Sequence, residues 1–157
     1  MESVTLTPIG LLRASESGFT VELAPAFRPG LAGLEGFSHI QILWWFHGIK
    51  APRNPPLLCE KPYVKGPQAL GVFATRAPLR PNPLALTCAQ VAFIDQARGL
   101  VGLHYMDAWD GSPVLDLKPY TPSLDRVERP EVPGWCAHWP MSLEASGSFD
   151  WEAEFNF

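Results

Sequence analysis

Prolines and glycines interrupt this chain so often that almost no stretch is long enough for an α-helix. The 157 residues contain 17 prolines and 13 glycines, and a proline inside a helix removes a backbone hydrogen bond and clashes with the preceding turn. Only a short helix near residues 29–34 escapes this limit. The chain must therefore bury its apolar residues mainly in β-strands joined by irregular loops.

Several segments have the side-chain pattern of β-strands, because they alternate apolar and polar residues or are largely apolar. These segments are residues 19–23, 39–46 and 84–94. Two further segments, residues 99–106 and 113–118, predict a hairpin around the Asp110-Gly111 turn. The predicted fold is all-β: a small barrel of short, mostly antiparallel strands with long proline-rich loops.

The composition is that of a single domain over residues 1–157. Hydrophobic residues make up 46% of the chain, enough to bury a core without metals or disulfides. Cys59 and Cys136 are expected to be loop thiols and Cys88 a core residue, and their spacing predicts no metal site. The longest apolar run, residues 42–46, is too short to cross a membrane, so we expect a cytoplasmic protein.

The acidity of the chain belongs to its C-terminal part. Residues 1–124 hold ten Lys and Arg against nine Asp and Glu, whereas residues 125–157 hold two against seven. A neutral body with an acidic tail attracts nucleic acid only weakly. Within the tail, residues 149–157 alternate and predict an acidic strand that packs on its own barrel or on a second subunit. Its aromatic face comprises Phe149, Trp151, Phe155 and Phe157.

A rigid polar loop occupies residues 71–83, Gly-Val-Phe-Ala-Thr-Arg-Ala-Pro-Leu-Arg-Pro-Asn-Pro. Its three prolines fix the backbone around Arg76 and Arg80. Each arginine can offer a planar fork of donors to a carboxylate or a phosphate. The same segment also fits a proline-rich turn with two solvated arginines.

A second polar segment spans residues 106–120. Asp116 and Lys118 share one face of the strand that follows the Asp110-Gly111 turn. Two opposite charges beside a turn rich in carboxylates suit the rim of a site. They also suit a plain surface ion pair, the commoner outcome for such residues.

Together these segments resemble one protein family, the TrmO (YaeB, TsaA-like) family of S-adenosylmethionine-dependent tRNA methyltransferases, in a short form without the C-terminal domain. The resemblance covers residues 8–120. It also includes Pro8-Ile9-Gly10, Gly33-Leu34-Glu35-Gly36-Phe37-Ser38-His39 and Trp45-Phe46-His47. It implies a barrel fold, S-adenosylmethionine as cofactor, a homodimer, and methylation of N6-threonylcarbamoyladenosine beside the tRNA anticodon.

The resemblance also implies two sets of site residues. Those lining the cofactor pocket are His47, Gly48, Arg76, Leu86, Met106, Asp107 and Asp110. Those on the acceptor side, expected to be catalytic, are His39, Arg80, Asn82, Asp116, Lys118 and Tyr120. Arg76 would pair with the methionine carboxylate, and Asp116 or His39 would accept the amine proton.

Structural readings of some of these residues stay open. His47 also fits an ordinary strand-end histidine, and Leu86 also fits a core residue. His39 also fits a structural group that bonds a turn carbonyl.

The chain departs from the family pattern in ways that bear on the acceptor. The loop between Arg13 and Phe19 is shorter and has no counterpart to a Pro-x-Gln segment that touches the cofactor, while Ala85 and Ser112 replace glycine and threonine. The alternatives are therefore methylation of a smaller acceptor or a non-catalytic S-adenosylmethionine-binding barrel. If tRNA is the substrate, we expect a basic surface from Arg53, Lys61 and Lys65.

Overall fold

The computed structural model describes residues 4–49, 52 and 54–156. Contacts within the chain form two compact units. Of the residues described, the first comprises 4–49 and 82–126, and the second comprises 52, 54–81 and 127–156. Among the described residues, no helix is long and apolar enough to cross a membrane.

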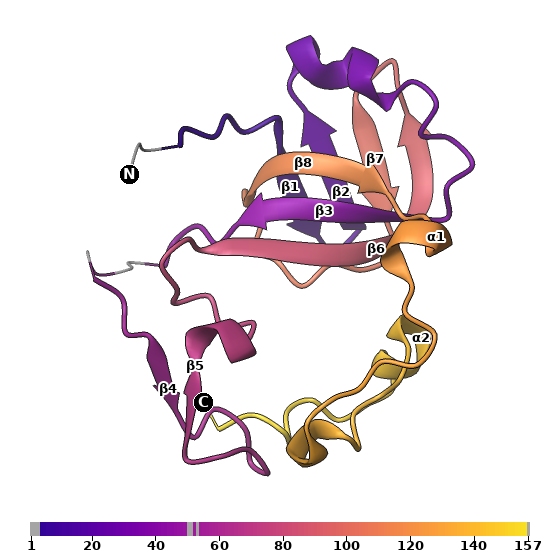
Figure 1. Ribbon diagram of the computed structural model, residues 1–157. Helices are drawn as coiled ribbons and strands as arrows, with labels where there is room; N and C mark the ends of the chain where they lie inside the picture. The colour runs from indigo at the N-terminus through magenta and orange to yellow at the C-terminus, as the bar shows by residue number, and fades with distance from the viewer. Residues whose placement is uncertain (1–3, 50–51, 53, 157) are drawn as a thin grey trace. The chain divides into compact units, whose positions relative to one another are not determined.

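The first unit is a closed barrel of six antiparallel strands, which confirms the predicted all-β barrel (Figure 1). Strand β8 pairs back onto β1 and closes the barrel. The predicted strands at residues 19–23, 39–46 and 84–94 correspond to β2, β3 and β6. The order around the barrel is β1 (Gly10–Ser15), β2 (Gly18–Leu23), β7 (Leu100–Leu103), β6 (Leu84–Asp95), β3 (His39–Trp45) and β8 (Pro113–Pro119).

The barrel interior is filled by alternate residues of these strands, as the period-two pattern predicts. The 3₁₀ helix η1 (Pro25–Leu31) overlaps the predicted short helix and adds Leu31 to the core. A single turn of helix, α1 (Pro122–Asp125), follows β8. The fully buried strand residues are Leu12, Val21, Ile40, Ile42, Val101 and Val114.

The predicted hairpin between residues 99–106 and 113–118 is wrong. Both segments contain strands, but β7 pairs with β2 and β6, whereas β8 pairs with β1 and β3. The Asp110-Gly111 turn lies against β1 instead, and the Gly111 amide donates to the Leu12 carbonyl at 2.8 Å. A local hairpin would leave β1 without the partner that closes the barrel, so closure determines the pairing.

The second unit contains little regular structure and is held by aromatic rings. Tyr63 stacks on Trp135, with ring centroids 5.1 Å apart, and Trp139 packs edge-on against both rings. Burial raises the pKa of the Tyr63 hydroxyl. Its elements are β4 (Leu58–Glu60), β5 (Ala69–Gly71), η2 (Val72–Ala74), η3 (Gly134–Cys136) and α2 (Leu143–Ser146), and β4 pairs with β5.

The predicted acidic strand at residues 149–157 is wrong over its described part, because residues 149–156 contain only one isolated β-bridge, from Phe155 to Tyr63. Phe157 lies outside the described residues. The aromatic side chains nevertheless share one side, since Trp151 stacks on Phe155 and contacts Phe149. The alternation therefore reflects packing into the aromatic cluster of the second unit, on a chain that turns instead of extending.

A buried carboxylate sits at the centre of this cluster. Glu154 is only 6% exposed. Its Oε1 lies 2.7 Å from His138 Nε2 and 3.7 Å from Lys65 Nζ, and its Oε2 accepts from Trp139 Nε1 at 3.1 Å. The hydrogen bonds from His138 and Trp139 lower the pKa of the Glu154 carboxyl below its ordinary value of 4.5.

We expect the second unit to lose stability in acid through Glu154. A carboxyl whose pKa is lower in the folded chain stabilises the fold above its unfolded pKa and loses that contribution as pH falls through the folded value. Tryptophan fluorescence should therefore report a loss of stability below about pH 4.5 in the wild type. Glu154→Gln should flatten this pH dependence, whereas Glu152→Gln, at an exposed neighbouring position, should retain it. Equal profiles for the two variants would contradict this role.

Candidate functional site

Most of the residues predicted on the acceptor side lie on or beside the outer face of β6, β3 and β8. These three strands lie side by side (Figure 1). Leu43 on β3 pairs with Leu86 of β6 on one side and with Asp116 of β8 on the other. The next outward row pairs Gln41 with Lys118. The predicted site residues brought onto or beside this face are His39, Leu86, Asp116, Lys118 and Tyr120.

A groove of about 480 Å³ runs over this face. Its apolar walls include Leu43, Leu86 and Leu124. Leu86 is 48% exposed, so its reading as a core residue is wrong. Gln41 Nε2 donates to Asp125 Oδ1 at 2.9 Å, which ties α1 to β3 along the edge of the groove. The groove is thus an apolar surface with polar groups at fixed positions, the usual composition of a small-molecule site.

Asp116 and Lys118 form a close ion pair in this groove. Asp116 Oδ2 lies 2.6 Å from Lys118 Nζ, and Asp116 Oδ1 accepts the Leu117 amide at 2.9 Å. The hydrogen bond to Asp116 raises the pKa of the Lys118 amine, which keeps it a cation. This geometry agrees with both readings of the pair, a site rim and a surface ion pair.

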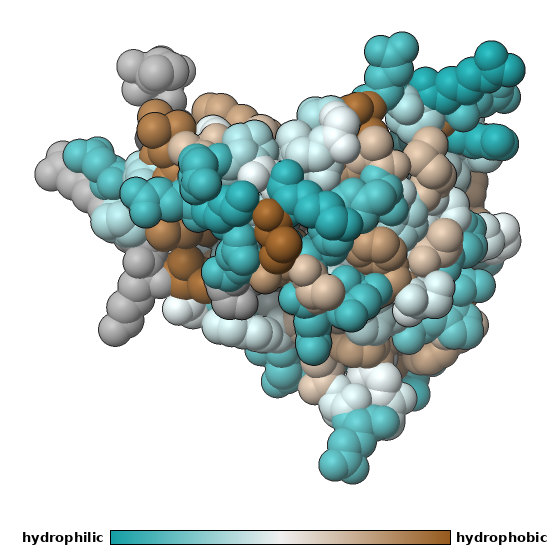
Figure 2. Space-filling model, turned by 90° about the horizontal axis from the view of Figure 1, so that it is seen from below, coloured by the Kyte–Doolittle hydropathy of each residue, from teal (hydrophilic) through white to brown (hydrophobic). Residues whose placement is uncertain are grey.

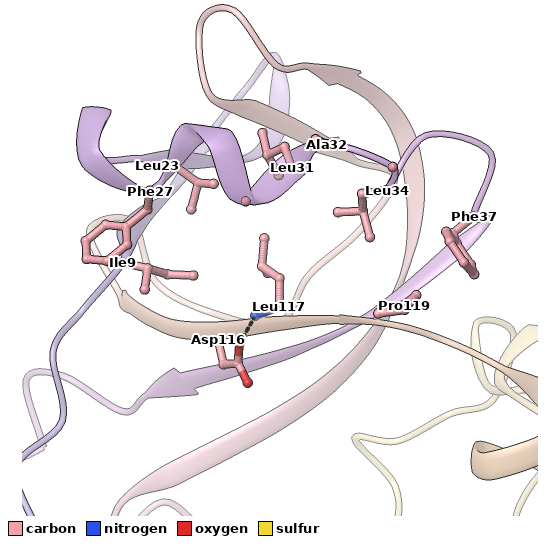
Figure 3. A pocket seen from close by; sticks show the side chains of 12 residues that line it. Ile9, Leu23, Phe27, Leu31, Ala32, Leu34, Phe37, Asp116, Leu117 and Pro119 are labelled. Carbon is pink, nitrogen blue, oxygen red and sulfur yellow. Dashed lines mark hydrogen bonds between the residues drawn. The ribbon is translucent and has the colours of Figure 1, made fainter.

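Strand β8 separates this groove from an apolar cavity of about 350 Å³ that η1 also lines. Figure 3 shows Leu117 pointing into the cavity and Asp116 pointing away from it. Because successive strand residues face opposite sides, the Asp116 carboxylate is directed to the outer groove. Leucines and phenylalanines make up much of the cavity lining, and Asp116, whose carboxylate points away, is the one charged residue among the described residues of that lining.

His39 and Tyr120 lie beside each other at the end of the outer face. The Tyr120 amide donates to the His39 carbonyl at 3.0 Å, and their rings meet edge-on at 6.3 Å. His39 Nδ1 lies 2.9 Å from the Ser38 hydroxyl. His39 thus has a hydroxyl as partner instead of the turn carbonyl expected of a structural histidine. Within the described part of the chain, Nε2 makes no hydrogen bond and is the ring nitrogen left for a substrate.

The predicted cofactor residues after β3 meet the turn of residues 106–112. His47 Nδ1 lies 3.0 Å from the hydroxyl of Ser112, which is 1% exposed. The His47 ring meets the Trp109 ring nearly at right angles, with centroids 6.2 Å apart. Gly48 has φ +77° and lies directly beside Trp109.

The same turn is fastened to β1. Asp110 Oδ1 accepts the Ala14 amide at 3.0 Å, so this carboxylate has a fixed orientation. Asp107 is exposed, and its charge adds to burial in raising the pKa of the Tyr105 hydroxyl. The Met106 side chain is part of the barrel core at 1% exposure, so it can line a ligand site only through its backbone.

The two predicted arginines belong to the second unit and differ from each other. Arg80 is half-buried and folds back onto its own loop, where Nη1 approaches the carbonyls of Thr75 at 3.2 Å and Ala77 at 3.4 Å. Arg76 is exposed. The loop follows the short strand β5 and the turn η2, and the buried Thr75 hydroxyl donates to the Val72 carbonyl. Arg80 thus stabilises its own loop through Nη1, and its role toward an acceptor stays a prediction.

The remaining predicted residues are less engaged or lie elsewhere. Asn82 is exposed at the start of β6, where its carbonyl accepts the Leu84 amide. Of the expected basic surface, Lys61 Nζ donates to the Gly66 carbonyl and Lys65 approaches Glu154. Arg53 lies outside the described residues.

Sequence reasoning missed Gln41 and Asp125, and it included Trp109 in the cofactor-lining segment 106–110 without a role of its own. Gln41 stands two residues from both His39 and Leu43 on β3, so the strand period alone would have placed it on the outer face. Trp109 directly precedes the Asp110-Gly111 turn, and a large aromatic at a turn is a signal in itself. No comparable signal marks Asp125, because its contact with Gln41 joins residues 84 positions apart.

Three comparisons identify relatives of this chain. It is 39% identical over 111 residues to the Eikenella corrodens tRNA (adenine(37)-N6)-methyltransferase, covering 70% of this chain and 62% of that one. It is 34% identical over 124 residues to an S-adenosyl-L-methionine-binding protein of Archaeoglobus fulgidus, covering 76% of this chain and 81% of that one. The crystal structure of TrmO from Pseudomonas aeruginosa matches with a TM-score of 0.64 and 31% identity.

The matches to the Eikenella and Pseudomonas proteins cover more of this chain than of those relatives. The Pseudomonas match covers 83% of this chain but 62% of the crystallised one, so this chain spans about three fifths of the length of these two relatives. The family model of the tRNA-methyltransferase O N-terminal domain matches residues 3–126. That range includes all six barrel strands and the outer groove. This chain therefore belongs to the family of the tRNA-methyltransferase O N-terminal domain.

Proposed function

We propose that this protein is an S-adenosylmethionine-dependent methyltransferase that methylates N6-threonylcarbamoyladenosine in tRNA. The observation that carries the proposal is the outer groove, because it sets a carboxylate, an ammonium and the apolar Leu86 side by side. Two relatives support the two halves of the proposal, since one is named a tRNA adenine N6-methyltransferase and the other an S-adenosyl-L-methionine-binding protein. A homodimer acting in the cytoplasm belongs to the same proposal.

The residues of the first unit fit such a cofactor chemically. The exposed Asp107 and the oriented Asp110 offer acceptors to an amino group, a ribose or a positive sulfur. The His47 ring is held in place by a buried hydroxyl, and Leu86 offers an exposed apolar contact. The cofactor supplies a methyl group already activated by positive sulfur, so the chain has mainly to position the acceptor and remove its proton.

The acceptor side of the groove has groups that can hold the acceptor and groups that can take its proton. Lys118 is a cation that can hold the carboxylate of a threonylcarbamoyl group. The Asp116 carboxylate is fixed by its two donors and can take the proton of the reacting amine, with His39 as the other candidate. Arg76 for the methionine carboxylate, and Arg80 and Asn82 on the acceptor side, stay predictions.

A smaller acceptor is the second candidate, and charge favours it. Residues 125–157 hold seven acids against two bases, and Lys61 and Lys65 both make contacts within the second unit. An RNA substrate gains much of its affinity from lysines and arginines that neutralise phosphates. The non-catalytic alternative needs neither Asp116 nor Lys118 in a groove.

Methyl transfer from labelled S-adenosylmethionine decides among these candidates. We expect label in tRNA that carries the threonylcarbamoyl group and none in unmodified tRNA. The KM for tRNA should rise steeply with salt, since each phosphate contact releases a counterion when the tRNA binds. Label only in a small-molecule extract, with little salt dependence, would establish the smaller acceptor. Tight cofactor binding without label in any substrate would refute the enzyme and leave a binding protein.

A further inference from the structure

Gln41 is a polar residue of the outer groove to which the proposed function gives no role. It lines the groove from β3 and is partly buried. Exposed apolar residues do not by themselves mark a site on this protein, since Figure 2 shows brown, hydrophobic residues among teal ones on one face. A partly buried amide in an apolar groove is more informative, because each of its polar atoms needs a partner.

Asp125 determines which way the Gln41 amide faces. Gln41 Nε2 donates to Asp125 Oδ1 at 2.9 Å, and the Thr121 amide donates to Asp125 Oδ2 at 2.7 Å. An ionised carboxylate can only accept hydrogen bonds, so the amide atom turned toward it must be Nε2 and not the carbonyl oxygen. Since the Asp125 carboxylate is itself held by the backbone at the start of α1, the Gln41 side chain has a fixed orientation.

The carbonyl oxygen of Gln41 is left as an acceptor without a donor. Among the residues that the structure describes, none donates a hydrogen bond to Gln41 Oε1. Lys118 is the cross-strand partner of Gln41, but its ammonium is directed to Asp116. A partly buried carbonyl of this kind is suited to a ligand group that donates a hydrogen bond.

The place of Gln41 beside Lys118 matches a threonyl group. The two residues lie directly opposite each other in the β3–β8 register, where Cβ atoms are about 4.5–5.5 Å apart. The carboxylate and the hydroxyl of threonine are attached to neighbouring carbon atoms. A ligand whose carboxylate is held by Lys118 therefore has its hydroxyl within reach of Gln41. Leu124 lines the same groove and is 86% exposed, so it offers an apolar contact to the threonyl methyl group.

We propose that Gln41 accepts a hydrogen bond from the threonyl hydroxyl and thereby selects threonylcarbamoyladenosine over acceptors whose amino-acid side chain carries no hydroxyl. The inference rests on the proposed function, because it assumes that acceptor. Asp125 is a positioning residue, since it orients the amide without touching the substrate. Gln41 takes no part in proton transfer.

Two RNA acceptors that differ only at this hydroxyl test the contact. Synthetic anticodon stem-loops carry either threonylcarbamoyladenosine or valylcarbamoyladenosine, in which a methyl group takes the place of the hydroxyl. In the wild type, kcat/KM should be about five- to a hundredfold higher with the threonyl RNA, the range for leaving one polar group unpaired. In Gln41→Leu this ratio should fall to about one or below, because an apolar side chain no longer favours a hydroxyl.

Gln96→Leu is the matched control. Gln96 is an exposed glutamine in the turn between β6 and β7, outside the groove, so its replacement should keep the wild-type ratio. Asp125→Ala should lower the ratio, because the Gln41 amide is then free to turn. An unchanged ratio in Asp125→Ala would refute the orienting role.

A wild-type ratio near one, or an unchanged ratio in Gln41→Leu, would refute the contact with the hydroxyl while methyl transfer to the RNA stands. If the wild type methylates neither RNA, the proposed function fails and the contact with it.

Discussion

Replacing Gly10 by alanine is expected to destabilise the barrel by about 2–4 kcal/mol, the upper part of the range for overpacking. A Cβ at this position would lie 2.3 Å from the Glu22 carbonyl oxygen and 2.9 Å from the Leu23 Cα. Both atoms belong to the backbone of β2, which pairs with β1 and cannot rotate away as a side chain does. Urea unfolding followed by fluorescence measures the loss.

Gly30→Ala is the control for this effect. Gly30 lies in η1, and within the described part of the chain no atom lies within 4 Å of its added Cβ. Its replacement should change the free energy of unfolding by no more than about 0.5 kcal/mol. Equal free energies of unfolding for the two variants would contradict this prediction, because they would show that β1 and β2 can move apart at Gly10 without loss of stability. The glycine of the Pro8-Ile9-Gly10 motif is thus explained by strand packing, with no role in chemistry.

The strands of the barrel could be predicted because their signal is local. The segments that became β2, β3 and β6 show their period within a few residues, and the proline content excludes long helices. The pairing of β7 and β8 could not be predicted in the same way. Their partners lie up to about a hundred residues away, and barrel closure overrides the hairpin that the Asp110-Gly111 turn suggests.

The candidate site could likewise be predicted only where its residues are close together in the sequence. Asp116 and Lys118 were correctly placed on one face, since they are two residues apart on one strand. Their neighbours Leu43 and Gln41 come from β3 through cross-strand register, which the sequence does not display. The strand predicted at the C-terminal end is wrong for a related reason. The alternating aromatic residues of 149–156 pack into a cluster around Tyr63 and Trp139 without forming a sheet.

Asp116→Asn is expected to lower the rate of methyl transfer to threonylcarbamoyl tRNA by about 10²–10⁴-fold, the usual effect of removing a general base. Asparagine keeps the size of the side chain and can still accept the Leu117 amide, but it cannot take a proton. Affinity for S-adenosylhomocysteine should stay unchanged, because the carboxylate is proposed to act on the acceptor. Initial rates with saturating cofactor, together with calorimetry, separate the two effects.

The control must break an equally exposed ion pair that has no place in the groove. Arg13 Nε lies 2.9 Å from Glu22 Oε2 on the β1–β2 hairpin, so Glu22→Gln removes a comparable contact. Exposed pairs of this kind contribute little to stability, and neither variant should unfold. Equal activity of Asp116→Asn and Glu22→Gln would show that the Asp116–Lys118 contact is a plain surface ion pair. A loss of activity in His39→Gln alone would identify His39 as the proton acceptor.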